Sequence, residues 1–169
     1  KKMIGLSTIG NATLIAYDLQ AGSYTEYARA NPEDKEEWCV QLSEQIRTVL
    51  PKGGTILEVG VGEATTLTFL VKLLGTNITS AYGFDLSWSR IDEGRQWLTG
   101  SGQNANLFVG DLFKIPLVDN SIDVVYSSHS LEPNGGREEE AIAEAKTLRE
   151  TAIANAKIAL EEAFTPKIQ

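Results

Sequence analysis

The segment that most constrains the fold is a pair of glycines at the end of a short apolar run. Residues 55–60 have the β-branched and aliphatic composition of a buried strand, and Gly60 and Gly62 are separated by one residue. An apolar-periodic segment at about residues 64–74 has the spacing of a helix. A tight turn between a strand and a helix aims backbone N–H groups at a ligand, and glycine lacks the Cβ that would block its approach. The turn therefore predicts a site for a nucleotide-like cofactor.

The alternation of strand and helix continues beyond this turn. Further strand patterns occupy residues 80–84, 106–109 and 122–127, and a helical pattern occupies residues 87–98. This order predicts right-handed crossovers and an α/β fold, in which helices cover both faces of a mostly parallel, Rossmann-like sheet. Ligands of such sheets bind outside the carboxyl ends of the strands.

The N-terminal residues have a different pattern. Residues 3–17 contain two apolar runs around Gly10 and Asn11, a turn pair that predicts a hairpin. Residues 18–32 are polar and are expected to be irregular. A helix is predicted to begin at Pro32 with acidic residues in its first turn, and to end before Pro51.

The C-terminal residues predict helix. Residues 137–163 contain no glycine or proline and are rich in alanine, which favours one long helix or two with a slight break. We expect a single domain over residues 1–169. Its parts are an N-terminal hairpin or lid (1–32), a cofactor-binding core (33–136) and a helical tail (137–169).

Composition narrows the functional classes. The chain of 169 residues is 42% hydrophobic and 22% charged, which is typical of a soluble globular domain. Its net charge of −8 and pI of about 4.7 argue against a broad nucleic-acid surface. No apolar run predicts a membrane span, and no signal-peptide pattern begins the sequence. The lone Cys39 excludes an intrachain disulfide and favours a packed core thiol in the cytoplasm. One histidine and one cysteine predict no metal site.

Three acidic residues lie in or near the last positions of three predicted strands. They are Glu58, Asp85 and Asp111. Any one of them alone is typical of a loop or a helix start, but their joint placement predicts a binding site. Asp85 follows Gly62 by the spacing at which a carboxylate meets ribose hydroxyls. A dinucleotide fingerprint would need its third small residue at Thr65, whereas this chain has Ala64 one place earlier.

On these motifs the chain resembles the class I S-adenosylmethionine-dependent methyltransferases. The first motif of that family is an acid followed by glycines at alternate positions, and residues 58–64 match it with Ala64 in place of the last glycine. The resemblance implies that Gly60 and Gly62 pass close to the methionine portion of the cofactor and that Glu58 helps to hold its ammonium group.

The later motifs of the family match in the same order. By resemblance, Asp85 would bind the ribose hydroxyls, Leu86 would lie against the adenine, and Asp111 with Leu112 would read the adenine edge. By the same resemblance, Ser127 and His129 would belong to the segment that faces the methyl group. His129 is either a general base or a structural histidine near the pocket wall. Tyr17, Tyr24 and Tyr27 either lie over the pocket as a lid or have packing and surface roles.

The resemblance ends after Ala143. The family fold has seven strands, and this sequence continues as alanine-rich helix where the fifth strand is expected. The resemblance thus implies a truncated sheet of order 3-2-1-4, with residues 122–127 as an apolar edge strand. Such an edge is a hazard for pairing, so we expect the hairpin, the C-terminal helix or a second subunit of a homo-oligomer to cover it.

Two functional hypotheses follow. The chain is a methyltransferase that uses S-adenosylmethionine and a small-molecule acceptor, or it is a non-catalytic module that binds this cofactor. An NAD-dependent oxidoreductase is a weaker alternative because of the position of Ala64. The acidic net charge favours a small metabolite or a protein over a nucleic acid as the acceptor.

Overall fold

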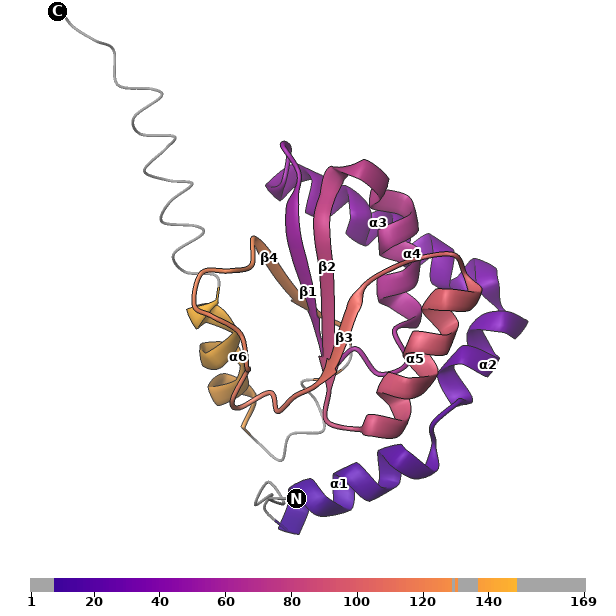
Figure 1. Cartoon of the computed structure of the whole chain (residues 1–169), viewed down its shortest axis with the longest axis vertical. Helices are drawn as coiled ribbons and strands as arrows, with labels where there is room; N and C mark the ends of the chain where they lie inside the picture. The colour runs from indigo at the N-terminus through magenta and orange to yellow at the C-terminus, as the bar shows by residue number, and fades with distance from the viewer. Residues whose placement is uncertain (1–7, 129, 131–136, 149–169) are drawn as a thin grey trace, which may run out of the picture.

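The computed structural model describes residues 8–128, 130 and 137–148 (Figure 1). The first three helices are α1 (Thr8–Leu19), α2 (Ser23–Ala30) and α3 (Pro32–Val49). The alternating part of the chain then contains β1 (Gly54–Val59), α4 (Thr65–Leu74), the 3₁₀ turn Gly75–Asn77, β2 (Ile78–Asp85), α5 (Trp88–Gly100), β3 (Asn106–Val109) and β4 (Val124–Ser127). The last described element is α6 (Glu138–Thr147).

The four strands form one sheet in the order β3-β2-β1-β4, and every pairing is parallel. This confirms the strand order expected from the sequence. Asp85 pairs with Val109, and Glu58 pairs with Gly83 on one side and Tyr126 on the other. The carboxyl ends of the strands therefore meet at one edge of the sheet, with the predicted acidic residues close to it.

Helices cover both faces of the sheet, as the predicted three-layer architecture requires. A core of Ile56, Leu67, Leu70 and Ile91 lies between one face and the helices α3, α4 and α5. The other face buries Leu57, Val59 and Phe84 against Leu148, which follows α6. Figure 1 shows α6 on the side of the sheet opposite to α3, α4 and α5. The alternation along β1 places Glu58 on the same face as Ile56.

The predicted N-terminal hairpin is wrong over residues 8–17, which belong to α1, and residues 3–7 lie outside the described part. A short apolar run does not distinguish strand from helix by periodicity. In the folded chain Leu14 and Tyr17, three residues apart, are half-buried, whereas Ile15 is 61% exposed. This spacing places the two half-buried side chains on one side of a helix. Residues 23–30, expected to be irregular, form α2.

The C-terminal prediction is confirmed as far as the description extends. Helix α6 lies within the predicted range 137–163, and residues 149–163 are outside the described part.

The fourth strand begins at Val124, two residues later than predicted. Asp123 accepts a hydrogen bond at Oδ2 from Thr55 N at 2.7 Å, which joins this strand start to β1.

One edge of β4 has no strand partner within residues 8–128, 130 and 137–148, where β4 pairs with β1 alone. Because residues 8–17 are helical, the predicted hairpin does not cover it. In this part of the chain, no helix is both long and apolar enough to cross a membrane.

Candidate functional site

The turn after β1 has the left-handed conformation that its glycines allow. Gly60 has φ +65° and Gly62 has φ +54°. A Cβ on Gly60 would lie 2.1 Å from the Cβ of Ser130, so close packing requires glycine there as well. Val61 N donates to Phe84 O at 2.8 Å and ties the turn to β2. Ala64, in place of the third family glycine, also has a left-handed φ of +54° and precedes α4 directly.

Glu58 is a buried acid beside this turn, with 1% of its surface exposed. Its Oε1 accepts a hydrogen bond from Ser128 Oγ at 2.6 Å, and its Oε2 accepts one from Tyr126 Oη at 3.2 Å. Burial raises the pKa of Glu58 to about 7, although these two hydrogen bonds and the charge of Lys35 oppose the rise. The carboxyl group therefore changes protonation near neutral pH, and a cationic ligand beside it would favour its ionised form.

Asp85 connects the end of β2 to the glycine turn. Its Oδ2 accepts from Gly62 N at 3.0 Å, and its Oδ1 accepts from Ser87 N at 2.9 Å. Burial raises the pKa of this carboxyl group, and the two N–H groups oppose that shift. The geometry fixes the carboxylate at the edge of the sheet, where the sequence predicted a group for ribose hydroxyls.

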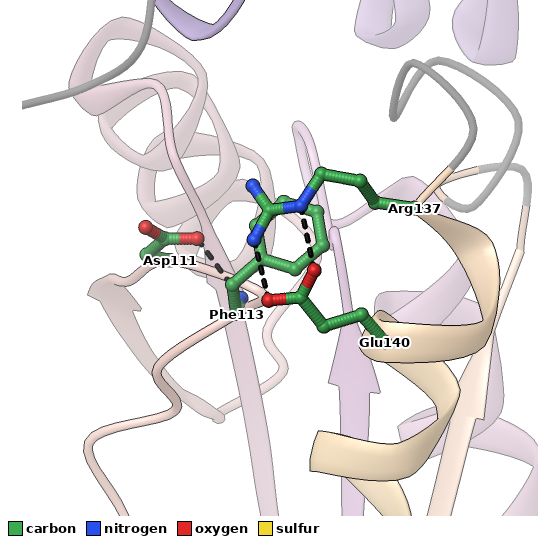
Figure 2. A network of polar contacts seen from close by, with 4 residues as sticks. All are labelled: Asp111, Phe113, Arg137 and Glu140. Carbon is green, nitrogen blue, oxygen red and sulfur yellow. Dashed lines mark hydrogen bonds and ion pairs between the residues drawn. The ribbon is translucent and has the colours of Figure 1, made fainter.

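Asp111 shapes the loop after β3. Its Oδ1 accepts a hydrogen bond from Phe113 N at 2.9 Å, and its carbonyl oxygen accepts one from Lys114 N at 3.0 Å, so residues 111–114 form a turn. Figure 2 shows the guanidinium group of Arg137 over the ring of Phe113, at 3.6 Å from its centroid. Glu140 holds that guanidinium with two hydrogen bonds of 2.5 and 2.7 Å. The start of α6 is thus joined to the loop that carries Asp111.

These strand ends surround one cavity of about 200 Å³. The predicted site residues that line it are Glu58, Gly60, Gly62, Asp85, Leu86, Asp111 and Leu112. Ser127 is not among its lining residues; its hydroxyl lies 2.5 Å from Ser130 Oγ, and Ser128 and Ser130 line the cavity instead. His129 lies outside the described residues.

Helices α1 and α2, here called the arm, complete one wall of the cavity. Tyr17 and Tyr24 line it, which supports the lid alternative for these two residues, whereas Tyr27 is not among the lining residues. Arg90 is 5% exposed and lies over both rings, at 4.5 Å from the centroid of Tyr17 and 4.8 Å from that of Tyr24. The core of the domain therefore contacts the arm directly at the cavity.

Sequence reasoning did not identify Lys35, Glu63 or Arg90, all of which line the cavity. A signal existed for Lys35, because it precedes the buried Cys39 by four residues and so lies on the same side of α3. No local pattern distinguishes Arg90, since its burial depends on aromatic residues that are remote in sequence. Within the described residues, no group of three His, Cys, Asp or Glu side chains is arranged to bind a metal.

Comparison with protein families identifies the class. The model of the methyltransferase domain family matches residues 56–151. The match covers more than half of the chain, which belongs to this family, and it confirms the class predicted from the motifs. It also supports S-adenosylmethionine as the cofactor.

Solved structures show the same fold. DesVI from Streptomyces venezuelae is 21% identical with a TM-score of 0.61, and the similarity covers 75% of this chain and 51% of DesVI. A SAM-dependent methyltransferase from Aquifex aeolicus is 21% identical with a TM-score of 0.53, over 63% of this chain and 57% of that one. The [4+2]-cyclase SpnF is 18% identical with a TM-score of 0.53, over 64% and 40%.

This chain therefore spans between 40% and 57% of the length of these three proteins. A search of curated protein sequences found no match.

Proposed function

We propose that the cavity binds S-adenosylmethionine and that the chain transfers its methyl group to a small-molecule acceptor. One observation carries the proposal: Glu58, Asp85 and Asp111, from the ends of three strands, line one cavity together with the glycine turn. This is the edge of a parallel sheet at which ligands bind.

The chemical character of each wall supports this cofactor. Each oxygen of Asp85 accepts one backbone hydrogen bond and keeps a further lone pair for a ribose hydroxyl. At the Glu58 end, an acid and Lys35 lie in one cavity, as a zwitterionic amino-acid group requires. Phe113 and Leu112 offer apolar surface beside Asp111 for a planar base.

The bound cofactor would supply a methyl group already activated by its sulfonium centre. The residues of this chain then have to orient the acceptor for in-line attack, exclude water and remove a proton where the acceptor carries one. We propose His129 as the general base and Ser127 as part of the segment facing the acceptor. The net charge of −8 supports a small metabolite rather than a nucleic acid as the acceptor. We also propose a cytoplasmic location, on the basis of the single cysteine.

Calorimetry with S-adenosylmethionine, S-adenosylhomocysteine and NAD tests the cofactor. We expect the first two to bind, and Asp85→Asn to weaken binding about tenfold or more, because a hydrogen bond to a charged group contributes about 1.5–3 kcal/mol. Asp92→Asn is the matched control, since Asp92 is exposed on α5 and is not among the cavity residues. Binding of NAD alone would replace this proposal with the oxidoreductase alternative.

A cofactor-binding module without methyl transfer is the second candidate. The partial coverage of the solved structures favours it, and the similarity to a protein described as a cyclase shows that the fold does not determine the reaction. A screen that follows formation of S-adenosylhomocysteine over many acceptors separates the two. Tight cofactor binding without turnover on any acceptor would favour the module.

A further inference from the structure

The glycine turn contains a buried acid that is directed at the arm. Glu63 follows Gly62, and 1% of its surface is exposed. Its Oε1 accepts a hydrogen bond from Gly22 N at 3.0 Å, and its Oε2 accepts one from Thr25 N at 2.7 Å. Both donors are backbone groups at the beginning of α2, so Glu63 caps a helix that precedes it by about 40 residues.

At this end of α2, Ser23 N donates to Gln20 O at 3.1 Å, whereas Gly22 N and Thr25 N both donate to the side chain of Glu63. The helix contains eight residues, which is too short for stability in isolation. Its N-cap residue, Gly22, has φ +97° and no side chain that could satisfy the first N–H groups. A carboxylate at this position is favourable both as an acceptor and toward the helix dipole. The start of α2 therefore depends on a residue of the cofactor turn.

A second set of contacts joins the arm to the core through residues at and near the start of α5. Arg90 Nε donates to Tyr17 O at 3.3 Å, and its guanidinium group lies over the rings of Tyr17 and Tyr24. Ser87, which precedes α5, donates a hydrogen bond from its hydroxyl to Asp18 Oδ1 at 2.5 Å. Glu63 and Arg90 thus position the two aromatic side chains that the arm contributes to the cavity wall.

We propose that Glu63 is a positioning residue that couples the glycine turn to the arm, so that the arm retains the bound cofactor and detaches when the cofactor exchanges. This inference rests on the proposed function. A ligand that contacts the turn and the two tyrosines stabilises the docked arm, and the docked arm slows the release of the ligand.

Glu63→Gln tests the coupling, because glutamine has the same shape but places an NH₂ group against one of the N–H donors. Glu26→Gln is the matched control. This substitution also removes one negative charge near the start of α2, but Glu26 is exposed and is not among the cavity residues. We expect S-adenosylhomocysteine to dissociate roughly fivefold faster from Glu63→Gln, the factor that corresponds to loss of one helix cap, and at the wild-type rate from Glu26→Gln. Stopped-flow competition measures these rates.

Hydrogen exchange distinguishes coupling from a purely structural role of Glu63, because a structural role alone would not make the exchange rates of the arm depend on the ligand. In the wild type, S-adenosylhomocysteine should slow exchange in residues 17–30 as well as in the glycine turn. In Glu63→Gln the turn should remain protected, whereas the protection of residues 17–30 should be several-fold weaker than in the wild type. The wild-type measurement alone tests the inference if the variant does not fold, because protection confined to the turn would overturn it.

The two proposals fail in different ways. Absence of any binding to the wild type overturns the proposed function and the coupling with it. Binding with equal release rates in wild type and Glu63→Gln overturns the coupling alone.

Discussion

The hydroxyl of Tyr126 donates a 3.2 Å hydrogen bond to Glu58 across the two strands β4 and β1, where the residues are register partners. The contact places a carboxyl group and a phenol in the same buried layer. Burial raises the pKa of Glu58 to about 7, and burial followed by the charge of Glu58 raises the pKa of Tyr126 well above its usual value. The edge of the sheet that carries the cavity thus contains an acid, Glu58, whose ionised form destabilises the folded chain when no cation is bound.

The pH dependence of stability should report this cost. The pKa of Glu58 rises from 4.5 in the unfolded chain to about 7 in the folded chain, so the folded state binds more protons between these values. The contribution of Glu58 to stability is therefore greatest below pH 4.5 and falls by about 3 kcal/mol as pH rises through 7. Urea unfolding of wild type and Glu58→Gln should show a smaller decline in the variant over this range.

Glu44→Gln is the control for that comparison, because Glu44 is an exposed acid on α3. Its pH profile should follow the wild type. Parallel profiles for wild type and Glu58→Gln would show that Glu58 has an ordinary pKa in the folded chain.

Two glycines with nearly the same φ allow a matched test of the turn. Gly60 and Gly102 have φ of +65° and +66°, but a Cβ on Gly60 would meet Ser130, whereas one on Gly102 would have no atom within 4 Å. Gly102→Ala should cost about 1–2 kcal/mol through left-handed strain. Gly60→Ala should cost roughly 1–3 kcal/mol more through overpacking and should weaken cofactor binding. Equal losses in urea unfolding would contradict the close packing at Gly60.

The alternating core could be predicted from the sequence, and so could the meeting of Glu58, Asp85 and Asp111 at one edge of the sheet, because strand, glycine turn and acid are local patterns. The sequence did not predict the arm. The apolar runs around Gly10 and Asn11 suit a hairpin as well as a helix. The contacts that join α1 and α2 to the core include those of Arg90 and Glu63. These contacts join residues far apart in sequence, so no local pattern contains them. Ser127 was expected in the cavity on resemblance alone, and its hydroxyl instead lies beside Ser130.

Cys39 should be chemically inert in the folded chain. It is 0% exposed, its Sγ lies 3.9 Å from Thr66 O, and burial raises its pKa to about 11. A rise of two units from 9.0 lowers the thiolate fraction about a hundredfold, and the thiolate is the reactive form. Alkylation by iodoacetamide at pH 8 should therefore be at least about a hundredfold slower in the native protein than in urea. Rapid labelling of the native protein would contradict this packing.

The two edge strands of the sheet should behave differently in self-association. Arg95 Nη2 on α5 donates a hydrogen bond to Leu107 O at 2.8 Å. A charged side chain therefore binds one of the backbone carbonyl groups of β3. No comparable contact is present for β4 in the described part of the chain, and its residues Val124 and Val125 are apolar. Open apolar edges favour pairing, so we predict a homo-oligomer that covers β4. Light scattering over a dilution series should show dissociation, and hydrogen exchange should show that β4 amides lose protection on dilution while β3 amides do not. A monomer at all concentrations whose β4 amides exchange freely would refute this assembly.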